Sequence, residues 1–208
     1  SRDRWLQLRR GGIGSSDAPA VLGLSRYKGP YDVWLDKVRG PDPMDRDTIE
    51  RRLGRLCEAG LADIYQEEIG REVLPAPAML LRHRKYPWVL ASLDRCTVGE
   101  DGQPRVLEIK TVWGPDHAHE WGTFGTDEVP MPYLVQVQQQ LAVTGWAGGD
   151  LVAMFPGNTL GVYEVPRNDV LIQTMMELEH LFWDKVVKGL APDFDWDHPR
   201  AAERVRRT

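Results

Sequence analysis

The chain has 208 residues, of which 42% are hydrophobic and 27% are charged, and its formal net charge is −5 at pH 7. This composition is typical of a soluble globular protein, and no apolar run approaches the length that a membrane span requires. The acidic balance excludes a surface uniformly coated for nucleic acid, but it leaves room for a local basic groove. Two cysteines, Cys57 and Cys96, are too few for a disulfide framework or an iron–sulfur site, which favours a reducing cytoplasm.

A glycine-dense turn is the first marked feature of the chain. Residues 9–17 read Arg-Arg-Gly-Gly-Ile-Gly-Ser-Ser-Asp and run into an apolar stretch, with Pro19 in the expected first turn of a helix. Ser16 or Asp17 is the expected N-cap. The turn is either a plain helix cap or a cradle for a phosphate, because free backbone N–H groups, a serine hydroxyl and an arginine gather there.

Two further helices are predicted in the amino-terminal third, over residues 30–39 and 45–69. The apolar residues of the longer helix recur at helical spacing and predict one buried stripe. That stripe consists of Ile49, Leu53, Leu56, Leu61 and Ile64. Glu58 lies outside it, roughly 60° past Leu61 at about 100° per residue, so periodicity alone places Glu58 in solvent.

A β-hairpin is the central feature of the prediction. Residues 71–81, broken by two prolines, are expected to form an edge strand that leads into it. Its arms, residues 89–98 and 105–112, are rich in β-branched and apolar residues, and the loop 99–104 contains the Gly, Asp and Pro that turns require.

Charged residues share one face of this hairpin. Side chains alternate along a strand, so Glu108 and Lys110 point the same way. If the arms pair with Asp94 near Glu108, two carboxylates converge beside a lysine. Such a pair suits Mg²⁺ or Mn²⁺, with the Ile109 carbonyl as a further oxygen donor. The alternative is that Glu-x-Lys is only the solvated side of an amphipathic strand.

A helix over residues 130–145 carries a cluster of glutamines. Gln136 and Gln140 lie four residues apart and share one face, whereas Gln138 does not. These amides are either buried, in which case they need hydrogen-bond partners, or exposed on a half-buried helix.

The last predicted elements are strands over residues 150–155 and 160–165 and a helix over 168–188. The inward positions expected for this helix are Leu171, Met175, Leu178, Phe182 and Val186. Together the elements predict an α/β (α+β) fold, a mixed central sheet flanked by helices. No linker divides the chain, so we expect a single domain over residues 1–208, with a basic tail from about residue 193.

Motifs along nearly the whole chain, from Trp5 to about Pro192, resemble those of the YqaJ-like phage recombinases. These are relatives of the lambda exonuclease in the PD-(D/E)XK nuclease superfamily. The motifs are Trp5-x-x-Leu8-Arg9, Ile13-Gly14-x-Ser16-Asp17, Gly54-x-x-x-Glu58, Ser92-Leu93-Asp94, Glu108-Ile109-Lys110-Thr111, Pro132-Tyr133-x-x-Gln136-x-Gln138, Leu141-Ala142-Val143-Thr144-Gly145 and Phe182-Trp183.

The resemblance implies a restriction-endonuclease-like core and a role for each site residue. Asp94, Glu108 and the Ile109 carbonyl would hold metal, with Lys110 positioning or activating the attacking water. Glu58, against its periodicity, would face the active site and serve the second of two Mg²⁺ or Mn²⁺ ions. Either Gln136 or Gln138 would contact the scissile region. Arg9 and Ser16 resemble the residues that hold a terminal 5′-phosphate.

The implied activity is a metal-dependent exonuclease that digests linear double-stranded DNA from its ends, in the 5′-to-3′ direction, and leaves single strands for phage-type recombination. The implied partners are double-stranded DNA ends, a single-strand annealing protein and further copies of the chain in a ring-shaped trimer, with no membrane. The expected location is the cytoplasm of a bacterium or phage-infected host. An endonuclease of the same superfamily and a non-catalytic DNA-binding recombination partner remain as alternatives.

Overall fold

The computed structural model describes residues 2–40, 47–114, 118–199 and 201, so half of the predicted basic tail, including its four arginines, lies outside the described residues. A five-stranded mixed sheet forms the centre, with strand order β1-β4-β5-β6-β7. Only β5 and β6 pair in parallel, and the other neighbours are antiparallel. The strands are β1 Val73–Pro75, β4 Arg95–Val98, β5 Pro104–Thr111, β6 Gly148–Phe155 and β7 Thr159–Pro166. The predicted fold class is therefore confirmed, and residues 73–75 form the edge strand expected there.

The predicted hairpin is present, but its first arm is divided. β4 and β5 pair antiparallel, with Arg95 opposite Leu107. The preceding residues instead form β3 (Leu90–Ala91), which pairs with β2 (Leu81–Arg82) in a separate two-stranded sheet. The chain changes sheet across Ser92–Asp94, and this break matters for the site described below.

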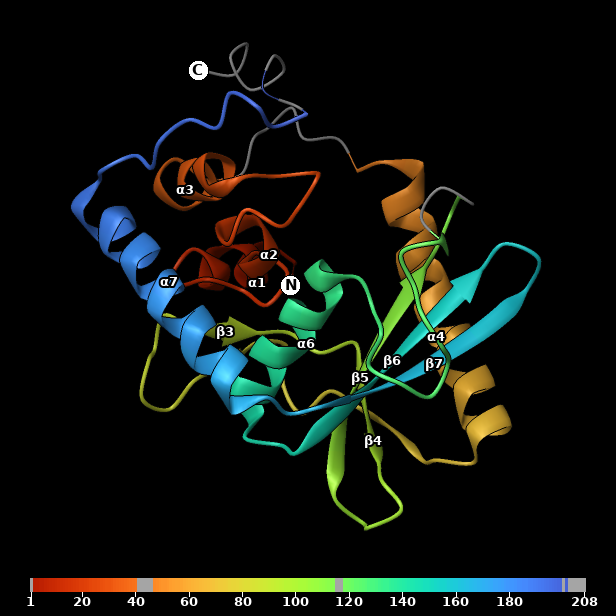
Figure 1. The fold of residues 1–208 in the computed structure, drawn as a ribbon. Coiled ribbons are helices and arrows are strands. Elements are labelled where there is room, and N and C mark those ends of the chain that lie inside the picture. The colour runs from red at the N-terminus through yellow and green to blue at the C-terminus, as the bar shows by residue number, and fades with distance from the viewer. Residues whose placement is uncertain (1, 41–46, 115–117, 200, 202–208) are drawn as a thin grey trace.

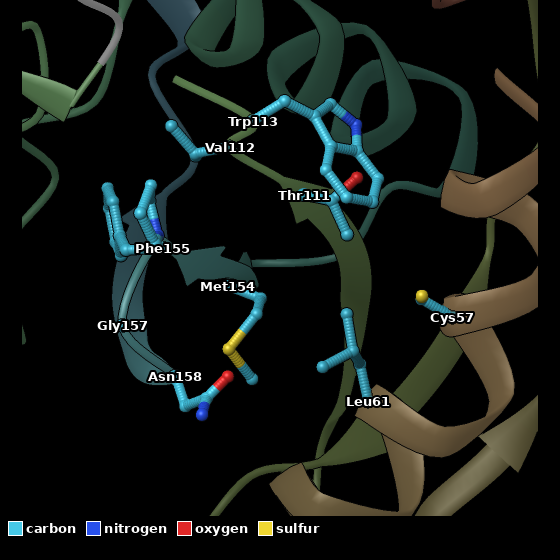
Figure 2. A pocket seen from close by; sticks show the side chains of 10 residues that line it. Cys57, Leu61, Thr111, Val112, Trp113, Met154, Phe155, Gly157 and Asn158 are labelled. Atoms are coloured by element: carbon cyan, nitrogen blue, oxygen red, sulfur yellow. The ribbon is translucent and has the colours of Figure 1, made fainter. Parts of the chain in front are cut away.

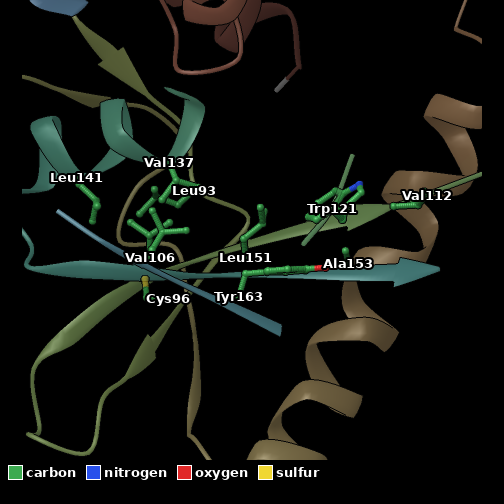
Figure 3. Close-up of a cluster of buried hydrophobic side chains, with 11 residues drawn as sticks. Leu93, Cys96, Val106, Val112, Trp121, Val137, Leu141, Leu151, Ala153 and Tyr163 are labelled. Carbon is green, nitrogen blue, oxygen red and sulfur yellow. The ribbon is translucent and has the colours of Figure 1, made fainter. Parts of the chain in front are cut away.

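Helices cover both faces of the central sheet (Figure 1). On one face, α6 (Met131–Thr144) packs Val137 and Leu141 against strand residues such as Val106, as Figure 3 shows. On the other face, α4 (Ile49–Ile69) packs Leu61 against Leu107. The period-two alternation of β5 therefore serves two separate cores.

Four more helices lie beyond α6, and they enclose a core of their own around Ile13 and Trp34. They are α1 Arg2–Arg9, α2 Ala18–Val21, α3 Pro30–Val38 and α7 Asp169–Lys188. α1 was not predicted, because its sequence RDRWLQLR is polar all round and has no marked apolar face. Within the described ranges, no helix is both long and apolar enough to cross a bilayer.

One predicted apolar stripe is wrong, and the other, which is buried at Met175 and Phe182 as expected, is wrong at one position. On α4, Leu56 is 74% and Ile49 69% exposed, and the buried residues are Leu61, Ala62 and Tyr65. The helix packs on the sheet only from Cys57 onward, so the apolar side chains Ile49 and Leu56 of its earlier turns face solvent. On α7, Leu178 is 49% exposed and Glu179 only 1%.

Candidate active site

The break between β3 and β4 places Asp94 beside β5. One residue before the Arg95–Leu107 pair, the Asp94 carboxylate turns toward β5, and its Oδ2 accepts a hydrogen bond from Ile109 N at 2.9 Å. Asp94 and Glu108 thus lie close together, as expected if the hairpin arms pair. Lys110 lies on the same face as Glu108, and its Nζ is 2.5 Å from Glu108 Oε1.

The Glu108 carboxylate is buried and fully supplied with donors. It is 1% exposed. Oε1 accepts from Lys110 Nζ and Gln136 Nε2, and Oε2 accepts from Gln140 Nε2 at 2.6 Å. A carboxylate removed from water is costly unless charges and hydrogen bonds replace its hydration, and here β5 and α6 together provide both.

The electrostatics of the cluster reflect crowded charges. Burial and, to a smaller extent, the Glu108 carboxylate raise the pKa of Asp94 to about 7, while Lys110 acts in the opposite direction. Burial lowers the pKa of Lys110, but the neighbouring carboxylates of Glu108 and Asp94 outweigh this effect and raise it overall. Lys110 therefore stays an ammonium at neutral pH.

Glu58 is half-buried, contrary to the exposed position that periodicity predicted. Burial raises its pKa, and Glu108 raises it further, whereas Lys110 and Arg95 lower it. These couplings show that α4 carries Glu58 to within electrostatic reach of Glu108 and Lys110. Its position depends on where α4 crosses the sheet, and helix periodicity carries no information about that crossing.

The glutamines of α6 form hydrogen bonds with two different parts of the molecule. Gln136 and Gln140 reach Glu108, and Gln140 Nε2 also donates to Ser92 O at 3.0 Å. The structure does not bring Gln138 to the cluster: its Nε2 donates to Pro166 O at 2.7 Å, and its Oε1 accepts from Asn168 N at 2.9 Å. Because Gln138 and Gln140 are each 1% exposed or less, the surface alternative for these amides is wrong.

A cavity of about 230 Å³ joins this cluster to the glycine-dense turn. Arg9 and Ser16 lie at one side of it, and Arg9 Nη2 donates to Ser16 Oγ at 2.9 Å. The lining residues are Trp5, Arg9, Gly14, Ser15, Ser16, Ser92, Asp94, Glu108, Lys110 and Gln136. Arg9 and Ser16, which were predicted to hold a phosphate, therefore line the same cavity as two of the predicted metal ligands, Asp94 and Glu108, whereas Glu58 is not among its lining residues.

Three residues near the cavity had no predicted role there. Trp5 Nε1 donates to Ser92 Oγ at 3.1 Å, and the Arg9 guanidinium lies 4.6 Å from the centroid of the Trp5 ring. Trp5 and Ser92 belong to the motifs quoted above, which was the available signal. Gln140 was marked only by its four-residue spacing from Gln136.

A second cavity of about 270 Å³ lies between α4, the end of β5 and the β6–β7 turn. Figure 2 shows it lined mainly by apolar side chains, among them Leu61, Trp113, Met154 and Phe155. Four of the predicted catalytic residues line the smaller cavity instead, namely Asp94, Glu108, Lys110 and Gln136, and none lines the larger one, so the larger one is not the candidate active site.

The donor set of the smaller cavity suits a hard cation. Asp94 and Glu108 offer buried carboxylates whose mutual repulsion raises the pKa of Asp94, and a divalent cation between them would relieve it. Across the described part of the chain, no three His, Cys, Asp or Glu side chains gather as a ready-made metal cluster. The carboxylates of Asp94 and Glu108 therefore fit a divalent cation, and the Ile109 carbonyl and Glu58 stay predicted further donors.

Comparisons with known proteins identify the family of this chain. Residues 4–147 match the sequence profile of the YqaJ-like viral recombinase domain. The chain is 38% identical over 199 residues to the uncharacterised protein YqaJ of Bacillus subtilis (strain 168), covering 94% of this chain and 60% of that protein. The family resemblance expected from the sequence is therefore confirmed.

The fold is similar to that of the alkaline exonuclease LHK-Exo from Laribacter hongkongensis. Its crystal structure superposes with a TM-score of 0.69 at 18% identity, covering 99% of this chain and 97% of that one. The structure of LHK-Exo in complex with dAMP gives a TM-score of 0.70 at 17% identity, covering 99% and 100% of the two chains. This likeness confirms the nuclease-like architecture of the sheet and helices.

Proposed function

Since the chain belongs to the family of YqaJ-like viral recombinase domains, we propose that it is a metal-dependent exonuclease that digests linear double-stranded DNA from its 5′ ends. The observation that carries the proposal is the shared cavity. Asp94, Glu108 and Lys110 line it together with Arg9 and Ser16. A terminal phosphate and a phosphodiester bond nearby in the same strand could thus be bound together.

Arg9 and Ser16 would explain a dependence on DNA ends. A 5′-terminal phosphate monoester has more negative charge and more free oxygens than an internal phosphodiester, so Arg9 and the Ser16 hydroxyl would favour it. Trp5, whose ring lies beside Arg9, would restrict how the terminal nucleotide enters. Closed circular DNA offers no such group.

Asp94, Glu108 and Lys110 supply the charged groups that cleavage would use. Mg²⁺ or Mn²⁺, when bound by Asp94 and Glu108, would polarise the phosphate and lower the pKa of a water. Lys110, held by Glu108 at 2.5 Å, provides an ammonium that can orient the attacking water or stabilise charge on the phosphate. Gln136 shares Glu108 Oε1 with Lys110 and keeps that carboxylate directed into the cavity.

The solved structure and the sequence relative support different parts of the proposal. LHK-Exo is described as an alkaline exonuclease and has been solved with dAMP, a deoxynucleoside monophosphate. At 18% identity that likeness concerns the fold, so the exonuclease activity of this chain rests on its own site residues. The chain spans about 60% of YqaJ from Bacillus subtilis, and the recombination role, the annealing partner and a trimeric ring belong to the proposal as well.

The test uses one duplex sequence in two forms, an end-labelled linear DNA and a covalently closed circle, with Mg²⁺ or with EDTA. We expect digestion of the linear form only, in Mg²⁺ only. Asp94→Ala and Lys110→Ala should each lose activity by about a thousandfold or more, since each removes an interaction required in the transition state.

Glu100→Ala is the matched control, because Glu100 is an exposed carboxylate of the same hairpin, with its side chain 92% exposed. Cutting of closed circles would identify an endonuclease instead. Tight DNA binding without digestion of either DNA form in Mg²⁺ would identify a non-catalytic recombination partner. Full activity in both the Asp94 and Lys110 variants would overturn the proposed site.

A further inference from the structure

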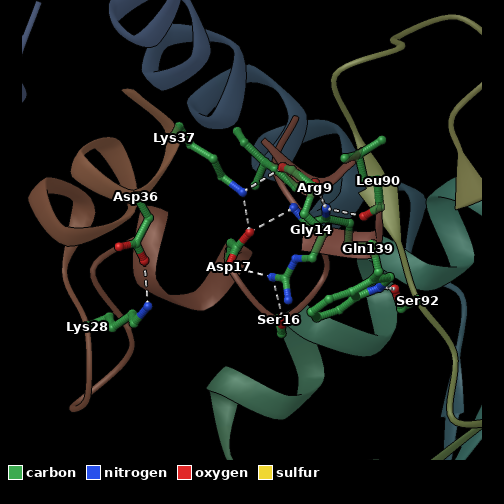
Figure 4. Close-up of polar contacts among 12 residues, drawn as sticks. Arg9, Gly14, Ser16, Asp17, Lys28, Asp36, Lys37, Leu90, Ser92 and Gln139 are labelled. Carbon is green, nitrogen blue, oxygen red and sulfur yellow. Dashed lines mark hydrogen bonds and ion pairs between the residues drawn. The ribbon is translucent and has the colours of Figure 1, made fainter. Parts of the chain in front are cut away.

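A buried charge network lies behind Arg9, on the side away from the carboxylate cluster. The Asp17 carboxylate accepts three hydrogen bonds, from Arg9 Nη2 at 2.7 Å, from Lys37 Nζ at 2.7 Å and from Gly14 N at 3.1 Å. Figure 4 shows Asp17 between the two cationic side chains. Neither Asp17 nor Lys37 is among the residues that line the cavity.

The network fixes Arg9 at both ends. Its guanidinium is bound by Asp17 and lies against the Trp5 ring, and its main-chain carbonyl accepts from Lys37 Nζ at 3.0 Å. A long side chain held this way loses little further rotamer freedom when it binds an anion. The orientation of Arg9 is therefore set before any ligand arrives.

The charges of the network leave a surplus. Burial would raise the pKa of Asp17, but Arg9 and Lys37 outweigh it and hold that pKa well below its usual range. Glu179 is the other nearby acid, and burial raises its pKa to about 8, so it is mostly uncharged at pH 7. Arg9 and Lys37 against Asp17 then give a net charge of +1. An Arg9–Asp17 pair without Lys37 would be neutral.

Building on the proposed function, we propose that Asp17 and Lys37 are positioning residues for the phosphate at a 5′ DNA end. Asp17 directs the Arg9 guanidinium into the cavity. Lys37 neutralises the negative charge of Asp17. The positive charge of Arg9 is therefore left to attract the phosphate. The selectivity of the cavity for phosphorylated ends would thus depend on a lysine that does not touch the DNA.

The experiment measures binding of two duplexes that differ only in a 5′-phosphate or a 5′-hydroxyl, by fluorescence anisotropy in EDTA. The wild type should prefer the phosphate. Lys37→Gln keeps hydrogen-bond donors for Asp17 but removes the charge, and it should lower this preference about tenfold, with a matching rise of KM and little change of kcat in Mg²⁺.

The double variant Asp17→Asn/Lys37→Gln is the decisive one. It restores the net charge of +1 and leaves an amide oxygen for Arg9, so its preference should return to within about threefold of the wild type. A merely structural network predicts the reverse, because the double variant loses more native contacts than the single one. Lys28→Met is the matched control, since it breaks the 2.6 Å ion pair that Lys28 makes with Asp36 of α3, the helix that also carries Lys37, outside the cavity.

The outcomes separate this inference from the function it builds on. A wild type that digests linear DNA but binds both duplexes equally would remove the 5′-phosphate anchor itself. A wild-type preference that survives in Lys37→Gln, or that is lost to the same extent in the double variant as in the single one, would overturn the roles of Lys37 and Asp17. Should Lys37→Gln fail to fold, a preference that falls more than threefold below the wild type in the double variant would still overturn the charge roles of Lys37 and Asp17.

Discussion

Two glutamates of this protein are equally buried but differ in their surroundings. Glu108 on β5 and Glu179 on α7 are each 1% exposed. Glu108 accepts hydrogen bonds from Lys110, Gln136 and Gln140. Among the residues that the structure describes, none donates a hydrogen bond to either carboxyl oxygen of Glu179.

The difference between the two glutamates lies in the groups that surround each carboxyl group. Glu108 lies at the edge of a cavity with an ammonium and two amides beside it, and these groups supply the hydrogen bonds that water would otherwise donate to its carboxyl oxygens. Glu179 lies between packed helices, where burial and the charge of Asp17 raise its pKa to about 8, so the protein holds it as a neutral acid. Burial alone therefore does not mark a functional carboxylate; its partners do.

The largest expected contrast is in catalysis. Glu108→Gln should reduce exonuclease activity by about a thousandfold or more, because the amide cannot hold a divalent cation and cannot keep its charge pairing with Lys110. Glu179→Gln, an identical chemical change at an equally buried position, should leave kcat within about twofold of the wild type. Comparable losses in both variants would mean that the two sites are not functionally distinct.

The second contrast is in the pH dependence of stability. The pKa of Glu179 is about 8 in the folded state, against an ordinary value of 4.5. Between these values the unfolded chain loses the proton and the folded chain keeps it, so stability falls as pH rises. Between pH 5 and pH 8 this should cost on the order of 3 kcal/mol.

Denaturant unfolding of wild type and Glu179→Gln at several pH values checks this, since subtraction cancels the other titrating groups. The two stability curves should converge near pH 4 and separate towards pH 8, with the variant the more stable. Parallel curves would show that Glu179 has a partner that keeps it charged.

The same contrast explains what the sequence could predict. Asp94, Glu108 and Lys110 were found because strand alternation and hairpin pairing are local rules, and the structure places the three side chains together. Helix periodicity identifies an apolar stripe but not how far a neighbouring sheet extends beneath it. That is why Leu56 proved exposed and Glu58 half-buried.

Partners from distant parts of the chain were beyond the reach of such rules. The sequence marked Gln136 and Gln140 as sharing a face, yet their common partner Glu108 is 28 and 32 residues away along the chain. Glu179 was missed for the converse reason: a helical pattern favours Leu178 for the interior, and only the packing of α7 on its neighbours puts an acid there.

The smallest contrast lies within α6 and separates donors to the site from donors to the scaffold. Gln136→Ala removes a donor from Glu108 and should reduce exonuclease activity about tenfold, with a stability loss of about 1 kcal/mol. Gln138→Ala removes the bonds to Pro166 O and Asn168 N and should reduce stability by about 1–2 kcal/mol while kcat is unchanged. Urea unfolding and initial rates on linear duplex DNA measure both effects. A Gln138 variant that loses activity without losing stability would place that residue, rather than Gln136, at the DNA.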